Sequence, residues 1–153
     1  MPNLPFGFEK PEDSPGFLLW QTTLMWQRRI KKALEEYDIS HPQFVIMATL
    51  LWFGAHHYDT TQISIAQWTK LDKMTVSKSL LKLSILGLVR RMEHAQDTRA
   101  KSVVLTEKGI HLVRKLVPIV EQIDQDFFGK ATTTQQQALI AILGKLTAES
   151  DGN

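Results

Sequence analysis

Residues 61–109 have the sequence TQISIAQWTK LDKMTVSKSL LKLSILGLVR RMEHAQDTRA KSVVLTEKG, and this stretch decides the fold. Its spacing of apolar residues predicts two short helices joined by a tight turn. After Gly87, short runs of alternating apolar and polar residues predict a β-hairpin. The stretch therefore indicates a helix–turn–helix followed by a hairpin wing, and the rest of the chain can be interpreted outward from it.

The second of these helices is predicted over residues 73–86. Asp72 can cap its first turn, because the carboxylate accepts hydrogen bonds from the free N–H groups there. Gly87 is a natural stop at the other end. The apolar residues Val76, Leu80 and Leu83 repeat at helical spacing and predict one buried stripe.

The opposite side of this helix carries hydroxyls and cations, and no carboxylate follows Asp72 within it. Such a surface suits a groove lined by phosphates. An ordinary solvated helix face would have a similar composition, so the neighbouring segments decide between the two interpretations. The candidate DNA-contacting residues on this helix are Lys73, Thr75, Ser77, Lys78, Ser79 and Lys82.

The first helix is predicted over residues 62–69, with Thr61 as its N-cap. Ile65 and Ala66 should turn inward, and small Ala66 would let the two helices cross closely. Lys70 occupies a turn position where glycine is common. A left-handed backbone there would cost a side chain about 1–2 kcal/mol, or else the turn takes a different shape.

The hairpin is predicted from strands at residues 88–92 and 102–105, with a polar segment between them. That segment contains Asp97, Arg99 and Lys101 and is too hydrophilic to pack inside the protein. A basic hairpin beside a recognition helix is typical of a DNA-binding wing, whose arginine can enter the narrow minor groove. The alternative is a solvent-exposed loop without a partner.

The run DTRAKSVVLTEKG at residues 97–109 resembles the wing signature of the MarR family of bacterial regulators. That signature is Asp-x-Arg at the wing tip, a strand, and then Leu-Thr-x-x-Gly. SHPQF at 40–44 and MTVS at 74–77 also agree, and the resemblance extends over roughly residues 14–146. It implies a winged-helix homodimer that binds pseudo-palindromic DNA and is often released by small molecules. It also implies that Arg99 enters the minor groove and that Asp97 orients it.

Charge is distributed unevenly along the chain. Residues 62–108 hold nine Lys or Arg against four Asp or Glu, a balance of +5, whereas the whole chain carries only +2. The residues outside this segment therefore carry −3. The basic segment is expected to face a polyanion.

The remaining helices predict a partner subunit. A helix over residues 14–37 has two apolar sides, which implies burial between layers. Ser40 and Gln43 form a capping box for the next helix. Thr106 caps a long helix, and a last helix follows Thr134. The alternative to pairing with a second copy is that the terminal helices fold back on their own chain.

The predicted fold is mainly α with a small β-hairpin wing, in one MarR-like unit spanning residues 1–153. Residues 40–106 form its winged helix-turn-helix part, while residues 14–37 and 107–147 supply dimerisation helices. Pairing these helices would set two recognition helices about 34–36 Å apart, one turn of DNA.

Other chemistry is weakly represented. There is no cysteine, no signal peptide and no apolar run long enough for a bilayer, so we expect a cytoplasmic protein without disulfides and without membrane contact. Phosphate-binding loops and nucleophile elbows are absent, which argues against an enzyme, and no cofactor is expected. A metal site is disfavoured because the candidate ligands lack ligand spacing. These candidates are His41, His56, His57, Asp59, His94 and His111.

A small-molecule pocket is the remaining hypothesis. Trp20, Trp26 and Trp52 lie in helices that should meet where the dimerisation and DNA-binding parts join, although they could equally be plain core aromatics. A pocket of this kind would suit an aromatic or otherwise flat anion. The sequence thus predicts a homodimeric, sequence-specific DNA-binding repressor that a small molecule releases. The alternatives are a winged-helix protein-interaction module without DNA binding and a metal-responsive regulator.

Overall fold

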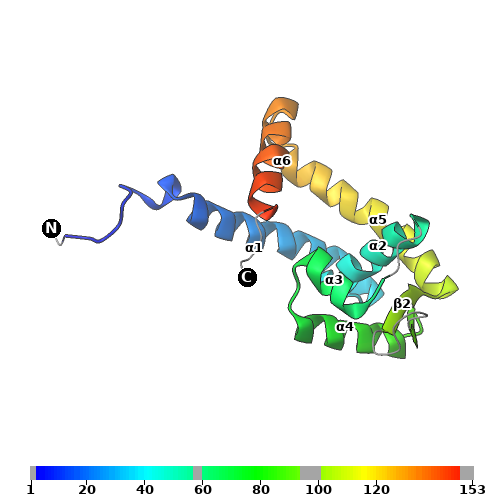
Figure 1. Cartoon of the computed structure of the whole chain (residues 1–153). Coiled ribbons are helices and arrows are strands. Elements are labelled where there is room, and N and C mark those ends of the chain that lie inside the picture. Colours follow the sequence, from blue (N-terminus) through cyan, green and yellow to red (C-terminus); the bar gives the residue numbers. More distant parts are fainter. Residues whose placement is uncertain (1–2, 57–59, 94–100, 149–153) are drawn as a thin grey trace.

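The computed structural model describes residues 3–56, 60–93 and 101–148 of the chain. Six α-helices, two 3₁₀ turns and one two-stranded sheet follow one another along this part of the chain (Figure 1). In chain order they are η1 (Pro11–Asp13), α1 (Pro15–Leu34), η2 (Glu35–Tyr37), α2 (His41–Ala55), α3 (Gln62–Thr69), α4 (Lys73–Ile85), β1 (Val89–Glu93), β2 (Lys101–Leu105), α5 (Glu107–Phe128) and α6 (Thr133–Thr147).

The predicted fold class is confirmed, because the molecule is mainly helical with one small antiparallel hairpin. Strands β1 and β2 pair with Val89 opposite Leu105 and Arg91 opposite Val103. Helices α3 and α4 form the helix–turn–helix, and α4 packs against β1 as well as α2. Both helices begin at the residues that the caps predicted.

Local hydrogen bonds explain why these two helices begin and end where they do. The Asp72 carboxylate accepts from the backbone N–H of Thr75 at 2.7 Å. Thr61 and Ser64 exchange hydrogen bonds as a capping box. Lys70 ends α3 in the left-handed region, at φ 65°. Of the two possible turn shapes, the chain therefore has the left-handed one, which is strained for a residue with a side chain. Gly87 ends the α4 segment at φ 74°, where glycine avoids the steric cost.

The core lies where the two long helices meet the winged part. Ile30 and Leu34 of α1 are fully buried, as are Val113 and Leu116 of α5. They join one apolar cluster with residues of α2, α3, α4 and both strands. Gly109 lets α5 start against the hairpin, since a Cβ there would collide with the carbonyl oxygen of Leu88. The glycine of Leu-Thr-x-x-Gly is therefore required by packing.

The terminal helices are far less covered. Figure 1 shows the chain's N-terminal arm and the first turns of α1 projecting away from the winged part. Within the described chain, α6 buries none of its residues. It also begins at Thr133 with Thr132 as its cap, two residues earlier than expected, because the capping box that forms is that of Thr132 with Gln135 and not the equally spaced pair of Thr134 with Gln137. No helix in the described ranges is both long and apolar enough to cross a membrane.

Candidate nucleic-acid interface

Helix α4 presents most of its predicted contact residues to solvent. Lys73, Ser77, Lys78 and Lys82 are exposed. Thr75 is half-buried, and its hydroxyl donates to the second Asp72 carboxylate oxygen at 2.8 Å. The cap thus already uses the Thr75 hydroxyl, whereas the Ser77 hydroxyl lies on the open surface.

Ser79 does not belong to this surface, and its prediction as a DNA contact is corrected here. Only 7% of its surface is exposed. The reason is helical geometry: position 79 lies three residues after Val76 and four before Leu83, so it shares their buried face. The small hydroxyl side chain fits there because it lets the neighbouring elements approach α4 closely.

The predicted wing-tip residues Asp97 and Arg99 lie outside the described residues, so their roles stay predictions. Lys101 opens β2, where its backbone is paired in register with Glu93. The hairpin itself is present at the predicted place, one residue later in β1 and one residue earlier in β2. Strand β1 of the hairpin packs against α4, which is the position expected for a wing.

Sequence reasoning missed Arg91 of β1. Its side chain lies on the inner side of the hairpin and its Nη2 donates to the carbonyl oxygen of Ser77 at 3.4 Å. A signal was available, because Arg91 follows Val89 at the two-residue strand period and so had to share the buried face. Met74, on the first turn of α4, was also missed as an exposed apolar side chain.

Two interactions affect the charged side chains at the two ends of α4. The pKa of Asp72 is lowered, first by the backbone hydrogen bond from Thr75 and then by the Thr75 hydroxyl, so this carboxylate stays charged at the start of the helix. Near the other end, the Lys82 ammonium lies 3.8 Å from the Asp38 carboxylate. Lys82 is therefore partly neutralised by its own subunit, whereas Lys78 has no such ion pair among the described residues.

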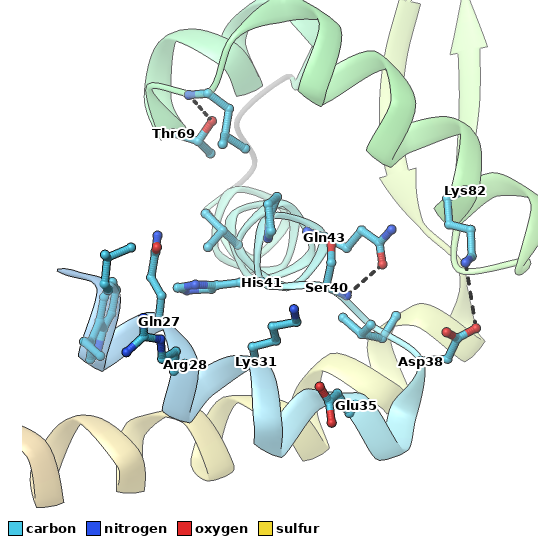
Figure 2. A pocket seen from close by; sticks show the side chains of 16 residues that line it. Gln27, Arg28, Lys31, Glu35, Asp38, Ser40, His41, Gln43, Thr69 and Lys82 are labelled. Carbon is cyan, nitrogen blue, oxygen red and sulfur yellow. Dashed lines mark hydrogen bonds and ion pairs between the residues drawn. The ribbon is translucent and has the colours of Figure 1, made fainter. Parts of the chain in front are cut away.

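A cavity of about 840 Å³ separates α1 from the helix–turn–helix (Figure 2). Its walls come from α1, the start of α2 and the α3–α4 turn, with Lys82 at one edge beside Asp38. Apolar side chains of the lining include Leu24, Trp26, Val45 and Leu71; the charged ones are Arg28, Lys31, Glu35, Asp38 and Lys82. The cavity thus combines a flat aromatic wall with three permanent cations and two carboxylates.

One wall of this cavity is held in place by a partly buried hydrogen bond between α1 and α5. The Trp26 indole N–H donates to the Asp124 carboxylate at 2.7 Å. The same indole meets the His41 ring edge to face, with centroids 5.2 Å apart. Burial lowers the pKa of His41, and the charge of Asp124 opposes that shift. His41 is therefore favoured in its neutral form inside the fold.

The structure does not bring the three predicted tryptophans to one cavity. Only Trp26 lines it. Trp20 is 63% exposed on the projecting part of α1. Trp52 instead stacks on His56 at the end of α2 and on Trp68 of α3. Sequence spacing could not reveal this, because the α2–α3 geometry decides which aromatic faces meet.

The described residues contain no group of three or more His, Cys, Asp or Glu placed to hold a metal ion. His41, His56 and His111 lie on different helices or helix ends. His57, Asp59 and His94 lie outside the described residues. Nothing in the described geometry favours the metal-responsive alternative.

Comparison with known proteins gives consistent results. A family model, the ArnR1-like winged-helix domain, matches residues 35–122. The HTH-type transcriptional regulator YdcH of Bacillus subtilis (strain 168) is 42% identical over 124 residues, covering 81% of this chain and 84% of that protein. By its name, this relative is a transcriptional regulator and not an enzyme.

Solved structures share the same fold. MepR of S. aureus, determined in complex with DNA, is 26% identical with a TM-score of 0.78, covering 87% of this chain and 96% of that one. BpsR of Bordetella bronchiseptica, whose DNA binding is regulated by 6-hydroxynicotinic acid, is 24% identical with a TM-score of 0.84 over 94% of this chain and 100% of that one.

Proposed function

The chain belongs to the MarR family of winged-helix transcriptional regulators, and from this premise we propose that it is a homodimer that binds a pseudo-palindromic operator in duplex DNA. The observation that carries the proposal is the exposed side of α4, where cations and hydroxyls stand without a carboxylate after Asp72. MepR, which shares this fold, was solved on DNA.

We assign the contacts by position on the two elements. Lys73 and Lys78 bind phosphates and fix the register of α4 in the major groove, while Ser77 reaches base edges. Lys82 contributes less because Asp38 engages it. On the wing, Arg99 enters the minor groove and Asp97 orients it, while Lys101 adds charge at the first residue of β2.

The proposed dimer is supported by the exposed apolar side chains of the terminal helices. Leu139, Ile140, Ile142, Leu143 and Leu146 of α6 are all exposed in the single subunit, as are Phe17, Leu18, Leu19 and Trp20 of α1. A patch of this kind marks a protein interface. We place it in residues 14–37 and 107–147, paired with the same residues of a second copy, and place the DNA-binding part in residues 40–106.

The cavity behind α4 supports release by a small-molecule ligand, and we propose that the protein is a repressor located in the cytoplasm. A flat anion could stack on Trp26 and place its charge near Lys31 and Arg28. Because the cavity separates α1 from the helix–turn–helix, an occupant would change how the recognition helices are spaced in the dimer. It could shift only an equilibrium between states that it binds unequally. BpsR offers a parallel, since 6-hydroxynicotinic acid is an aromatic acid.

The test of DNA binding is selection of bound sites from random duplex DNA with the full chain. The proposal expects two inverted half-sites whose centres lie about one helical turn apart. It also expects log affinity to fall steeply with log salt. No enrichment at low salt would favour the alternative, a winged-helix module that binds protein instead of DNA.

The ligand proposal has its own test. Aromatic carboxylates should raise the thermal midpoint of the protein and release selected DNA, whereas the matching neutral amides should do neither. The Lys31→Met variant should lose this response. Lys32→Met is the matched control, because Lys32 is also exposed on α1 but is not among the residues that line the cavity. Equal responses of the two variants would contradict the assignment of the anion site.

A further inference from the structure

Arg91 is the cation at the junction between the recognition helix and the wing. It follows Val89 on β1 and lies opposite Val103, and both valines are buried. Its side chain therefore leaves the hairpin on the inner side and reaches α4, where Nη2 donates to the Ser77 carbonyl oxygen. Arg90, the preceding residue, points to the other face of the hairpin and is exposed.

The hydrogen bonding of Arg91 is incomplete in the free subunit. Its Nε atom is buried and has no hydrogen-bond partner. Among the described residues, the guanidinium makes one hydrogen bond, and it is long, at 3.4 Å. Nor does any described carboxylate form an ion pair with it. A guanidinium carries five N–H donors, and a buried donor without an acceptor costs free energy unless a binding partner supplies one.

The position of Arg91 indicates which acceptor is missing. When α4 occupies the major groove and the hairpin occupies the adjacent minor groove, one sugar–phosphate strand runs between them. The junction of α4 and β1 must face that strand. Because Arg91 as a whole is only half-buried, part of its side chain already reaches the surface there. A rotamer change that gives up the long hydrogen bond to Ser77 would bring Nε out as well.

We propose that Arg91 binds a phosphate of the DNA strand that separates the two grooves, and so joins the contacts of α4 to those of the wing. The planar guanidinium suits this role because two of its N–H groups can donate in parallel to two phosphate oxygens. The inference rests on the proposed DNA binding. It adds an interaction that fixes how the helix and the wing are placed relative to each other on the duplex.

The first experiment compares Arg91→Met with Arg90→Met, two neighbours on one strand that lose the same charge from opposite faces. Duplex recovered by selection is titrated at several salt concentrations. Arg91→Met is expected to weaken binding about tenfold or more and to reduce the slope of log affinity against log salt by about 0.9, the value for one neutralised phosphate. Arg90→Met should change neither. An unchanged slope and affinity in Arg91→Met would overturn the inference.

A second experiment separates phosphate binding from a purely structural brace between β1 and α4. Single phosphates of the selected site are replaced by neutral methylphosphonates. With the wild-type protein, one replacement between the two groove footprints should weaken binding. With Arg91→Gln, which loses the charge but keeps an N–H donor for the Ser77 carbonyl oxygen, that same replacement should weaken binding clearly less. Equal weakening in both proteins would overturn the inference, and this comparison holds even if Arg91→Met fails to fold.

The two proposals fail in different ways. A wild-type protein that binds no duplex at low salt defeats the proposed function and this inference together. A wild-type protein that binds duplex, with Arg91 variants that match it in salt slope and in their response to methylphosphonates, defeats the phosphate-binding role of Arg91 alone.

Discussion

Helices α4 and α6 are similar in length but expose opposite kinds of surface. Helix α4 buries Val76, Leu80 and Leu83 in its own subunit and turns lysines outward. Helix α6 buries none of its residues in the described chain and turns apolar side chains outward, with Ile142 57% and Leu146 59% exposed. Helix α4 thus offers cations to a polyanion, although it also exposes Met74, Leu81 and Ile85. Helix α6 lacks, in the single subunit, an apolar surface to pack against, and such packing supplies most of the stability of a helix.

The contrast shows how one chain can specify two kinds of partner. Exposed lysines cost little in water, so α4 is stable before DNA arrives, and its contribution is measured by salt dependence. Exposed leucine and isoleucine favour association, so the contribution of α6 is measured by how dimer formation depends on subunit concentration. Changes to α4 should therefore alter salt-dependent DNA binding, whereas changes to α6 should alter the association of subunits.

The largest effect is expected from charges placed on α6. The double variant Ile142→Asp/Leu146→Asp should leave the single subunit folded, because both side chains are already exposed in it. It should, however, prevent the proposed dimer. Sedimentation equilibrium should then detect single subunits, and affinity for an inverted repeat should fall by about 100-fold or more, because the second half-site no longer adds avidity.

Gln137→Asp is the control for this experiment, since it adds a charge to an exposed polar position of the same helix. It should leave mass and affinity unchanged. A double variant that remains dimeric would show that α6 does not form the interface.

A smaller effect is expected within α4, between two lysines one turn apart. Lys78→Ala should lower affinity for all duplexes about tenfold and flatten the salt slope by about 0.9. Lys82→Ala should lower affinity less, because the Lys82 ammonium already lies 3.8 Å from Asp38. Asp38→Asn should in turn strengthen DNA binding slightly. The measurement is a salt titration of each variant on one selected duplex, and equal effects of the two lysines would contradict the partial neutralisation.

The local part of this architecture could be predicted from sequence. Caps and apolar spacing are properties of a few neighbouring residues, so α3 and α4 begin at the expected residues. The acidic Asp72 cap was likewise visible as a single residue before an apolar period. The same holds for the hairpin, whose ends shifted by only one residue.

The properties that depend on tertiary packing could not be predicted. The spacing of Ser79 from Val76 and Leu83 is visible in the sequence, but how far the buried face of α4 extends around the helix depends on the elements packed against it. Trp52 meets Trp68 because of the angle between α2 and α3. The ion pair of Asp38 with Lys82 joins residues far apart in the chain. Each case needs the relative placement of elements, which periodicity does not contain.

The turn that leads into α4 should respond to relief of backbone strain. Lys70 has φ 65°, where a Cβ is unfavourable, so Lys70→Gly should raise the free energy of unfolding by about 0.5–1 kcal/mol after the entropy cost of glycine is included. Urea unfolding measures the change. Lys70→Ala is the control, because it removes the same charge but keeps the Cβ. If alanine stabilised as much as glycine, charge and not strain would be the cause.

The smallest effect concerns the cap of α4 and its dependence on pH. Hydrogen bonds from Thr75 lower the folded-state pKa of Asp72 below its ordinary value of 3.8. The charged cap therefore stabilises the fold above pH 3.8, and this contribution is lost as the pH falls through 3.8 toward the folded-state pKa. Asp72→Asn keeps an acceptor for the Thr75 N–H but cannot titrate. The thermal midpoint of the wild-type protein should exceed that of D72N slightly at neutral pH, and the difference should shrink in acid. A difference that stayed constant or grew on acidification would show that the Asp72 charge does not stabilise the start of the recognition helix.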